Sequence, residues 1–213
     1  MKFGLFICSK KPIFAKVMEY RWRAKPLPNQ EQVLQLSESI RVNPYISTIL
    51  VQRGIDTYEK AEKFFRPKLE DLHNPFEMKD MDVAIKRIQT AVTNQEGILV
   101  YGDYDVDGTT AVSIVYSYFK SFNQNIEYYI PDRYKEGYGI SRAGLEYAAE
   151  NGFTLVITLD CGIRSNELVD YGNSLGLEMI ICDHHLPGDT LPKAAAILNP
   201  KRRDCTYPYK ELS

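Results

Sequence analysis

Three short clusters of carboxylate and imidazole side chains carry the chemistry that this sequence offers. Each cluster directly follows a run of apolar residues. The clusters are Asp103, Asp105 and Asp107 in YGDYDVDG, Asp160 in TLDCG, and Asp183, His184 and His185 in ICDHH. Gathered in one pocket, five carboxylates are costly to hold together unless cations neutralise them. The residue types therefore predict a divalent-metal site, with two metal ions as the expected number.

The apolar runs before the clusters are typical of strands buried in a parallel sheet, because they are short and rich in β-branched residues. Strands are expected at 97–101, 126–130, 154–159, 177–182 and 195–198, and helices at about 83–97, 108–122, 141–151 and 165–174. This alternation indicates βαβ units. The sequence predicts an α/β fold with a mostly parallel sheet flanked by helices, whose carboxyl edge gathers the clusters.

Residues 1–80 have a different pattern and predict a small helical segment ahead of a domain at 81–213. We expect a first helix capped by Asn29 and ended by Asn43-Pro44, a second over 47–52 and a third from 56 or 57 to 65. The chain ends at Ser213 without a stop signal. We therefore expect it to be the N-terminal part of a longer protein.

The composition is that of a soluble globular protein, with 213 residues, 44% hydrophobic and 25% charged residues and a net charge of −2. A polyanion would need a local basic patch, because the overall charge is nearly neutral. The apolar stretch before Lys10-Lys11 is too short for a signal peptide or a membrane span. These features predict a cytoplasmic protein without a membrane partner.

Alternate residues of an extended segment face the same side, so Asp103, Asp105 and Asp107 are expected to point into one pocket. Gly108 would then let the backbone turn into a helix whose N-terminal amides favour phosphate. Carboxylate oxygens select Mg²⁺ or Mn²⁺, and an added imidazole favours Mn²⁺. A calcium loop is an alternative, although the glutamate that closes an EF-hand is missing.

Other interpretations of the later clusters stay open. Asp160 alone is also typical of a helix cap, and Asp183 could cap a helix before two solvent-facing histidines. Cys161 and Cys182 at the strand ends could take part in a zinc site, although no CxxC pair is present. Adjacent histidines point in different directions, so one is expected to bind a metal while the other meets substrate or solvent.

The sequences YGDYDVDGTTA, TLDCG and CDHH resemble, in order and spacing, motifs I to III of the DHH phosphoesterases. They are most similar to the RecJ type, the single-strand-specific 5′→3′ DNA exonucleases. IPDRYKEGYGIS at 130–141 and ILNPKRRDCTYP at 197–208 are also similar to that type. The resemblance spans residues 81–213. It implies metal-dependent hydrolysis of phosphodiester bonds in single-stranded DNA, in DNA repair and recombination.

The resemblance also implies roles for the matching residues. Asp105 and Asp107 would bind separate Mn²⁺ ions and Asp160 would bridge them, with Asp103 in or next to the ligand set. His184 would bind a metal and His185 would contact the scissile phosphate, while Asp183 would orient the histidines. Asp160, His185 and Asp183 are thus the expected catalytic residues.

Substrate contacts are expected from the loop at 130–141. Arg133 is the candidate phosphate anchor, and a surface salt bridge is its alternative. Tyr138 is a candidate for stacking on unpaired bases, along a basic track to which Tyr134, Lys135 and Lys201-Arg202-Arg203 could contribute. Packing is the alternative for the tyrosines.

Two departures from the family pattern matter. Many DHH phosphoesterases have a histidine where this chain has Tyr101, which predicts looser binding of one metal. The family also has a fourth metal-binding aspartate in motif IV and a DHHA1 domain, and this sequence ends before both. The 213 residues alone are therefore expected to bind metal incompletely and to cut poorly.

Two other functions remain as alternatives. A DHH phosphoesterase could act on short oligonucleotides, cyclic dinucleotides or pyrophosphate, but Tyr101 and the loop at 130–141 argue against this. A catalytically silent nucleic-acid-binding module is the second, and the intact set of carboxylates and imidazoles argues against it.

Overall fold

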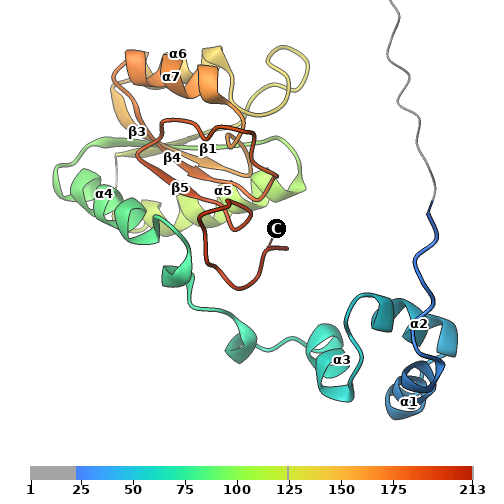
Figure 1. Ribbon diagram of the computed structural model, residues 1–213. Helices are drawn as coiled ribbons and strands as arrows, with labels where there is room; N and C mark the ends of the chain where they lie inside the picture. The colour runs from blue at the N-terminus through green and yellow to red at the C-terminus, as the bar shows by residue number, and fades with distance from the viewer. Residues whose placement is uncertain (1–22, 124, 213) are drawn as a thin grey trace, which may run out of the picture. The chain divides into compact units, whose positions relative to one another are not determined.

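The computed structural model describes residues 23–123 and 125–212, which belong to two compact units (Figure 1). One unit ends at Asp71 and the other begins at Leu72, earlier than the boundary expected at residue 80. Residues 72–80 belong with the second unit because Met78 packs against Cys205 and Tyr207. The N-terminal stretch in which no signal peptide is expected lies outside the described residues.

Within residues 23–71, the described part of the first unit, there are three α-helices, as expected. They are α1 (Gln30–Ile40), α2 (Pro44–Gln52) and α3 (Tyr58–Phe65), followed by the short 3₁₀ helix η1 (Leu69–Asp71). Leu36, Leu50 and Ala61 form their shared core. The cap at Asn29 is confirmed, since its side chain accepts hydrogen bonds from the N–H groups of Glu31 and Gln32.

The start of α2 differs from the expectation. This helix begins three residues earlier, because Pro44 occupies its first turn, where no backbone N–H is needed. The side chain of Asn43 caps the helix by accepting a hydrogen bond from the N–H of Tyr45. Asn43-Pro44 therefore starts α2, in addition to lying after α1.

The second unit is an α/β sandwich, which confirms the predicted fold class. Its elements are η2 (Pro75–Glu77), α4 (Met81–Thr93), β1 (Gly97–Gly102), α5 (Val106–Lys120), β2 (Ile126–Tyr129), α6 (Arg142–Glu150), β3 (Phe153–Leu159), α7 (Asn166–Ser174), β4 (Glu178–Cys182) and β5 (Ala196–Leu198). The five strands are all parallel and lie in the order β2-β1-β3-β4-β5. Within the described ranges, no helix has both the length and the hydropathy of a bilayer span.

The sheet is covered on both faces, which explains its continuously apolar strands. Leu99 and Tyr101 point into a core with residues of α6 and α7, whereas Ile98 and Val100 point to the opposite core with α4 and α5. Figure 1 shows α6 and α7 above the sheet and α4 and α5 below it. Because both faces are closed, the carboxyl edge of the sheet is where polar chemistry can be placed.

We expect Leu145→Ala to lower the free energy of unfolding of the second unit by about 2–5 kcal/mol. Leu145 lies on α6 and is fully buried in the core that α6 and α7 share with the sheet. Urea denaturation followed by far-UV circular dichroism measures the change. The matched control is Leu72→Ala, which removes the same atoms from an exposed position of the same unit and should cost less than about 0.5 kcal/mol. Equal effects of the two variants would contradict the assignment of this core.

Candidate metal centre

The register of three neighbouring strands places the three clusters side by side. Gly102, Leu159 and Cys182 are paired across β1, β3 and β4, and each is the last residue of its strand. Asp103, Asp160 and Asp183 are the next residues in each case. This edge is also where the strand order reverses between β1 and β3, the usual position of ligand sites in open α/β sheets.

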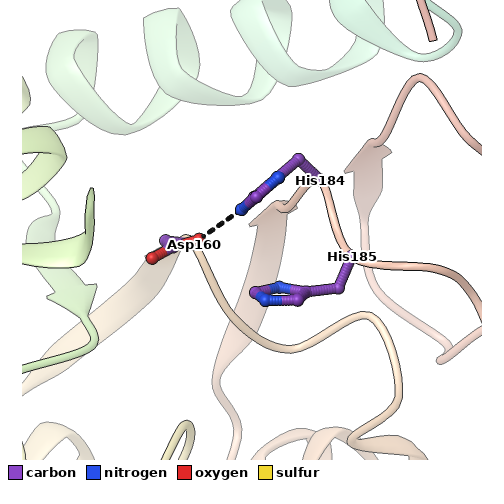
Figure 2. Close-up of side chains that lie close together, drawn as sticks. All are labelled: Asp160, His184 and His185. Atoms are coloured by element: carbon purple, nitrogen blue, oxygen red, sulfur yellow. Dashed lines mark hydrogen bonds and ion pairs between the residues drawn. The ribbon is translucent and has the colours of Figure 1, made fainter. Parts of the chain in front are cut away.

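Asp160, His184 and His185 form a group of possible metal ligands. One donor atom from each lies within 4.8 Å of the others, and Figure 2 shows the three side chains converging. The Nε2 atom of His184 lies 2.9 Å from Oδ1 of Asp160. The group joins the end of β3 to the loop after β4, as the sequence predicts for this edge.

The backbone at Asp160 is held in an uncommon conformation. Its φ angle is 61°, in the left-handed region that few residues other than glycine adopt. The N–H of Asp160 still donates to the carbonyl of Cys182 at 2.8 Å, so the chain turns sharply just after the last contact of the sheet. Such conformations persist at functional sites where surrounding contacts enforce them.

Asp183 holds the imidazole of His185 and the loop after β3. Its Oδ1 lies 2.7 Å from Nδ1 of His185 and also accepts the backbone N–H of that residue, while its Oδ2 accepts the N–H of Ile163 at 2.9 Å. Both oxygens of this buried carboxylate therefore have partners within the protein. A carboxylate at Nδ1 fixes the ring orientation and leaves Nε2 for a metal or a substrate.

Asp103 is fully buried and bonds to backbone amides. Its Oδ1 accepts the N–H of Tyr104 at 2.7 Å and its Oδ2 accepts the N–H of Gly139 at 3.1 Å. Burial raises the pKa of this carboxyl, against the effect of these two amides. Asp103 thus fastens the loop at 130–141 to the end of β1.

The prediction of an extended Asp103–Asp107 segment is wrong. Helix α5 begins at Val106, two residues earlier than expected, and Oδ1 of Asp105 caps it by accepting the N–H of Gly108 at 3.0 Å. Gly108 has a different role from the expected turn. A Cβ atom there would lie 2.5 Å from the carbonyl oxygen of Asp103, so only glycine permits this close approach of helix and strand end.

Asp107 lies in the first turn of α5 and lines a cavity of about 600 Å³ together with Asp160, Asp183 and His184. Asp105 does not line this cavity, but its negative charge acts on Asp160. The structure thus gathers Asp160, His184 and His185 as one donor group, with Asp107 on the same cavity. Asp103 and Asp105 instead use oxygens to bond backbone amides.

The electrostatics of the site favour a bound cation. Burial, followed by the charge of Asp105, raises the pKa of Asp160 to about 6, against the opposing effect of the two histidines. Burial and the nearby carboxylates Asp103, Asp105 and Asp160 likewise raise the pKa of the Tyr138 phenol. Carboxylate oxygens with imidazole nitrogen are ligands suited to Mn²⁺ and Mg²⁺, so the donor set fits these ions.

The two cysteines at the strand ends do not support the zinc alternative. Burial raises the pKa of both thiols, to about 12 for Cys182. The group of possible ligands identified within 23–123 and 125–212 contains no cysteine.

Tyr101, where the family resemblance leads us to expect a histidine, lies in the core with no exposed surface. Its hydroxyl donates to the carbonyl of Gly139 at 3.0 Å and accepts the N–H of Ser141 at 3.1 Å. Its ring stacks on Tyr129, with centroids 5.3 Å apart. Tyr101 therefore supports the turn whose Gly139 amide binds Asp103.

Arg133 and Tyr138 lie on the loop at 130–141 beside the acidic edge. The Arg133 guanidinium is 5.4 Å from the ring centre of Tyr104, which meets Tyr138 edge-on at 5.8 Å. The Tyr138 ring in turn faces that of His185 at 6.5 Å. No ion pair of Arg133 is found among the described residues, so its salt-bridge alternative is not observed.

The expected contribution of Arg202 to a basic track is wrong. Arg202 is buried and forms ion pairs with Asp80 and Asp204, and it also donates to the carbonyl of Ile197. The ion pair with Asp80 connects the segment after β5 to the N-terminus of α4. The sequence shows three adjacent cations but not which of them points inward.

Asn199 is a residue of the site that the sequence analysis missed. It is fully buried, and its Nδ2 donates to the carbonyl of His185 at 2.9 Å. Its Oδ1 accepts the N–H of Lys201 at 2.8 Å. The sequence contains one signal for this role, since Asn199 lies directly after β5 and directly before Pro200. In such turns an asparagine side chain often forms hydrogen bonds with the neighbouring backbone.

Comparison with known proteins agrees with this geometry. Residues 97–209 match the family model described as "DHH family, N-terminal domain". The single-stranded-DNA-specific exonuclease RecJ of Bacillus subtilis (strain 168) is 43% identical over 193 residues, which cover 91% of this chain and 24% of the relative. The protein of the same name from Escherichia coli (strain K12) is 35% identical, over 80% of this chain and 29% of the relative. The chain thus spans about a quarter of the length of these relatives.

Solved structures give the same result. A crystal structure of RecJ in complex with Mn²⁺ from Thermus thermophilus matches with a TM-score of 0.61 and 25% identity, over 87% of this chain and 26% of that chain. A crystal structure of exonuclease RecJ bound to manganese matches with a TM-score of 0.57 and 28% identity, over 62% and 34% of the two chains. On its strand order, on the residues at the carboxyl edge and on these similarities, the chain belongs to the DHH family.

Proposed function

We propose that this protein is a metal-dependent exonuclease that hydrolyses phosphodiester bonds of single-stranded DNA from the 5′ end, in DNA repair and recombination. The observation that carries the proposal is the convergence of Asp160, His184 and His185, with donor atoms within 4.8 Å, at the carboxyl edge of the sheet. Family membership and the names of the similar relatives support the class of reaction and the substrate.

Two divalent ions, Mn²⁺ or Mg²⁺, are the proposed cofactors. Asp105, Asp107, Asp160 and His184 would hold them, with Asp103 beside the ligand set. The ions would supply activation of a water molecule and neutralisation of charge on the phosphate. The raised pKa of Asp160 supports this assignment, because a buried carboxylate beside other carboxylates gains most from a cation.

His185 is proposed to contact the scissile phosphate through Nε2. Its Nδ1 lies against the carboxylate of Asp183, which accepts hydrogen bonds only, so the Nδ1 proton is retained there. Asp183 is itself fixed by the N–H of Ile163, so the imidazole is held before a substrate arrives. A side chain that is already oriented loses little freedom when it binds a phosphate oxygen.

Arg133 and Tyr138 are proposed as substrate contacts that favour a single strand. Unpaired bases stack on exposed aromatic rings, and Tyr104 and Tyr138 form an aromatic pair beside His185. Arg133, which lies over Tyr104, would anchor a phosphate next to these bases. A duplex cannot present its bases to such rings without unpairing.

We further propose that the protein works in the cytoplasm. The three cysteines within the described residues, Cys161, Cys182 and Cys205, are free thiols. Free buried thiols are usual in a reducing compartment.

The substrate class is tested by offering the full-length protein long single strands and dinucleotides in parallel with Mn²⁺. We expect the ratio kcat/KM to favour the long 5′-phosphorylated strand by about 10-fold or more, since each lost phosphate or stacking contact is worth about 1–3 kcal/mol. A preference for dinucleotides, linear or cyclic, would reassign the protein to the oligonucleotide-degrading members of the family.

We expect Asp160→Asn to lower kcat by more than about 100-fold, because even residues outside the ligand set commonly cost 10–100-fold. Binding of a single strand, measured by fluorescence anisotropy, should change far less. Release of labelled nucleotides in Mn²⁺ gives the rate, and Asp189→Asn at an exposed position is the matched control. Unchanged turnover in Asp160→Asn would remove Asp160 from the mechanism.

The same variant should stabilise the protein in the absence of metal. Folding raises the pKa of Asp160 from 3.8 to about 6, so the contribution of this carboxyl to the stability of the metal-free protein is most favourable below pH 4 and is lost as the pH rises through 6. Asparagine cannot ionise and also tolerates a left-handed backbone. At pH 7 in EDTA, we expect the free energy of unfolding of Asp160→Asn to exceed that of the wild type by about 1–3 kcal/mol. This range follows from the pKa shift, because each pKa unit corresponds to about 1.4 kcal/mol.

The pH dependence separates the two causes. The advantage of asparagine that comes from the lost carboxylate should shrink as the pH falls from 7 to 4, whereas its backbone advantage should not. Urea denaturation of both proteins across this range measures the difference, with Asp189→Asn as the control. A difference that stays constant with pH would show that the carboxylate is not destabilised in the fold.

A further inference from the structure

We propose that a second cavity beside His185, lined by Arg164 and Lys201, binds a substrate phosphate that neighbours the scissile one. This inference rests on the proposed function and adds to it a second subsite that binds an anion. The cavity has a volume of about 530 Å³ and also borders Tyr138, Ile163 and Leu186. It shares His184 and Asp183 with the cavity of the acidic edge, so a bound strand can reach both.

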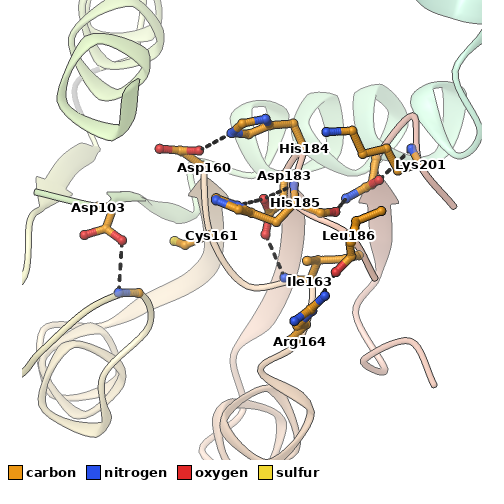
Figure 3. Close-up of polar contacts among 12 residues, drawn as sticks. Asp103, Asp160, Cys161, Ile163, Arg164, Asp183, His184, His185, Leu186 and Lys201 are labelled. Carbon is orange, nitrogen blue, oxygen red and sulfur yellow. Dashed lines mark hydrogen bonds and ion pairs between the residues drawn. The ribbon is translucent and has the colours of Figure 1, made fainter. Parts of the chain in front are cut away.

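The charges of the site divide on either side of the histidine pair. Asp107, Asp160 and Asp183 line the 600 Å³ cavity, and none of its lining residues is lysine or arginine. The 530 Å³ cavity has Arg164 and Lys201, and Asp183 is the acidic residue among its lining. Figure 3 shows Asp103 and Asp160 on one side of the histidines and Arg164, Leu186 and Lys201 on the other.

Asp183 keeps its negative charge, but neither of its oxygens is free to pair with these cations, because both already have partners in His185 and Ile163. The cavity beyond His185 is therefore a cationic pocket without a free acidic oxygen. A phosphodiester chain carries one charge per nucleotide, so a strand whose scissile phosphate lies at His185 would bring a neighbouring phosphate toward this pocket.

Arg164 is held in position for such a contact. Its Nε donates to the carbonyl of Leu186 at 2.6 Å. The two terminal amino groups of its guanidinium have no hydrogen-bond partner within the described ranges. A guanidinium anchored through Nε presents its remaining donors as a fixed fork, which suits two oxygens of one phosphate.

Lys201 is coupled to His185 through a buried amide. Asn199 accepts the N–H of Lys201 on one side and donates to the carbonyl of His185 on the other. The Nζ atom of Lys201 has no hydrogen bond or ion pair in the part of the chain that the structure describes. Asn199 therefore fixes the spacing between the backbone of His185 and that of Lys201, and leaves the ammonium group available for an anion.

Two phosphates of one substrate have the required chemistry. One is the internal phosphodiester on the far side of the scissile linkage, and the other is the terminal 5′-phosphate. Either would be a monoanionic or dianionic phosphate one nucleotide away from the bond that is cut. Recognition of this second phosphate would weaken the binding of substrates that carry only one phosphate group.

The test compares the wild-type full-length protein with Lys201→Gln, Arg164→Gln and the double variant, in steady-state cleavage of a single strand with Mn²⁺. We expect the double variant to raise KM by about 10-fold or more, with kcat within about threefold, because two charge-assisted hydrogen bonds are lost. Lys86→Gln, which removes the same charge from an exposed position on α4, should leave both constants unchanged. Thermal unfolding verifies that each variant is folded.

Modified substrates identify the phosphate. One strand carries an uncharged methylphosphonate at the linkage next to the scissile one, and another carries a 5′-hydroxyl in place of the 5′-phosphate. We expect one of these changes to raise KM strongly in the wild type and much less in the double variant. Coupling to the methylphosphonate assigns the internal phosphodiester, and coupling to the 5′-hydroxyl assigns the terminal phosphate.

Two outcomes overturn the inference, and they are distinguishable from failure of the proposed function. The double variant could cleave with the KM of the wild type, or both modified substrates could cost the wild type and the double variant equally. In each case the wild type still degrades single strands in Mn²⁺, so the proposed exonuclease function is retained and the proposed second subsite is refuted. A wild-type protein that cleaves no single strand would instead refute the proposed function.

Discussion

The mutual repulsion of carboxylates at one edge of the sheet is the constraint on which the rest of the second unit depends. The pairing of Gly102, Leu159 and Cys182 brings Asp103, Asp160 and Asp183 to the same level on adjacent strands. Each aspartate is buried, which makes its charge more costly. The protein meets this cost with backbone amides at Asp103 and Asp183 and with an imidazole at Asp160. The pKa of Asp160 nevertheless stays raised, and this is the carboxylate at which we propose that a cation binds.

The same edge shows how the fold separates positioning from chemistry. The polar side-chain atoms of Asp183, Asn199 and Tyr101 all have hydrogen-bond partners within the protein, and each residue holds a residue or loop that faces the cavities. Asp105, Asp107, His184 and His185 are left more accessible. The buried residues hold these accessible side chains in position. Accurate positioning matters, because a metal ligand or a phosphate contact that is misplaced by about 1 Å contributes much less to binding or catalysis.

Much of the fold could be predicted from the sequence, because its buried strands and amphipathic helices have strong periodic signals. The ends of all five strands lie within one residue of their expected positions, and the rule for parallel sheets predicts that the clusters gather at one edge. The local conformation at Asp105 could not be predicted, because a helix cap and an extended strand compete for the same residues. Asn43-Pro44 predicts the end of one helix, although Pro44 equally suits the first turn of the next, where the structure places it.

The parts of the site that escaped prediction depend on contacts between distant segments. The burial of Arg202 follows from Asp80, which lies 122 residues earlier. The contact of Asp103 with Gly139 and the link from Asn199 to His185 likewise need the folded chain. The sequence shows which residues could do chemistry, whereas the tertiary contacts decide which of them face the cavities.

The close contact between Gly108 and Asp103 has a consequence for how this sequence can vary. A side chain at position 108 would push the first turn of α5 away from the end of β1, and Asp105 and Asp107 would move with it. Substitutions at the neighbouring exposed positions Val106 and Thr110 leave that distance unchanged. Mutational libraries of this segment should therefore accept a single residue type at 108, even though position 108 carries no reactive group.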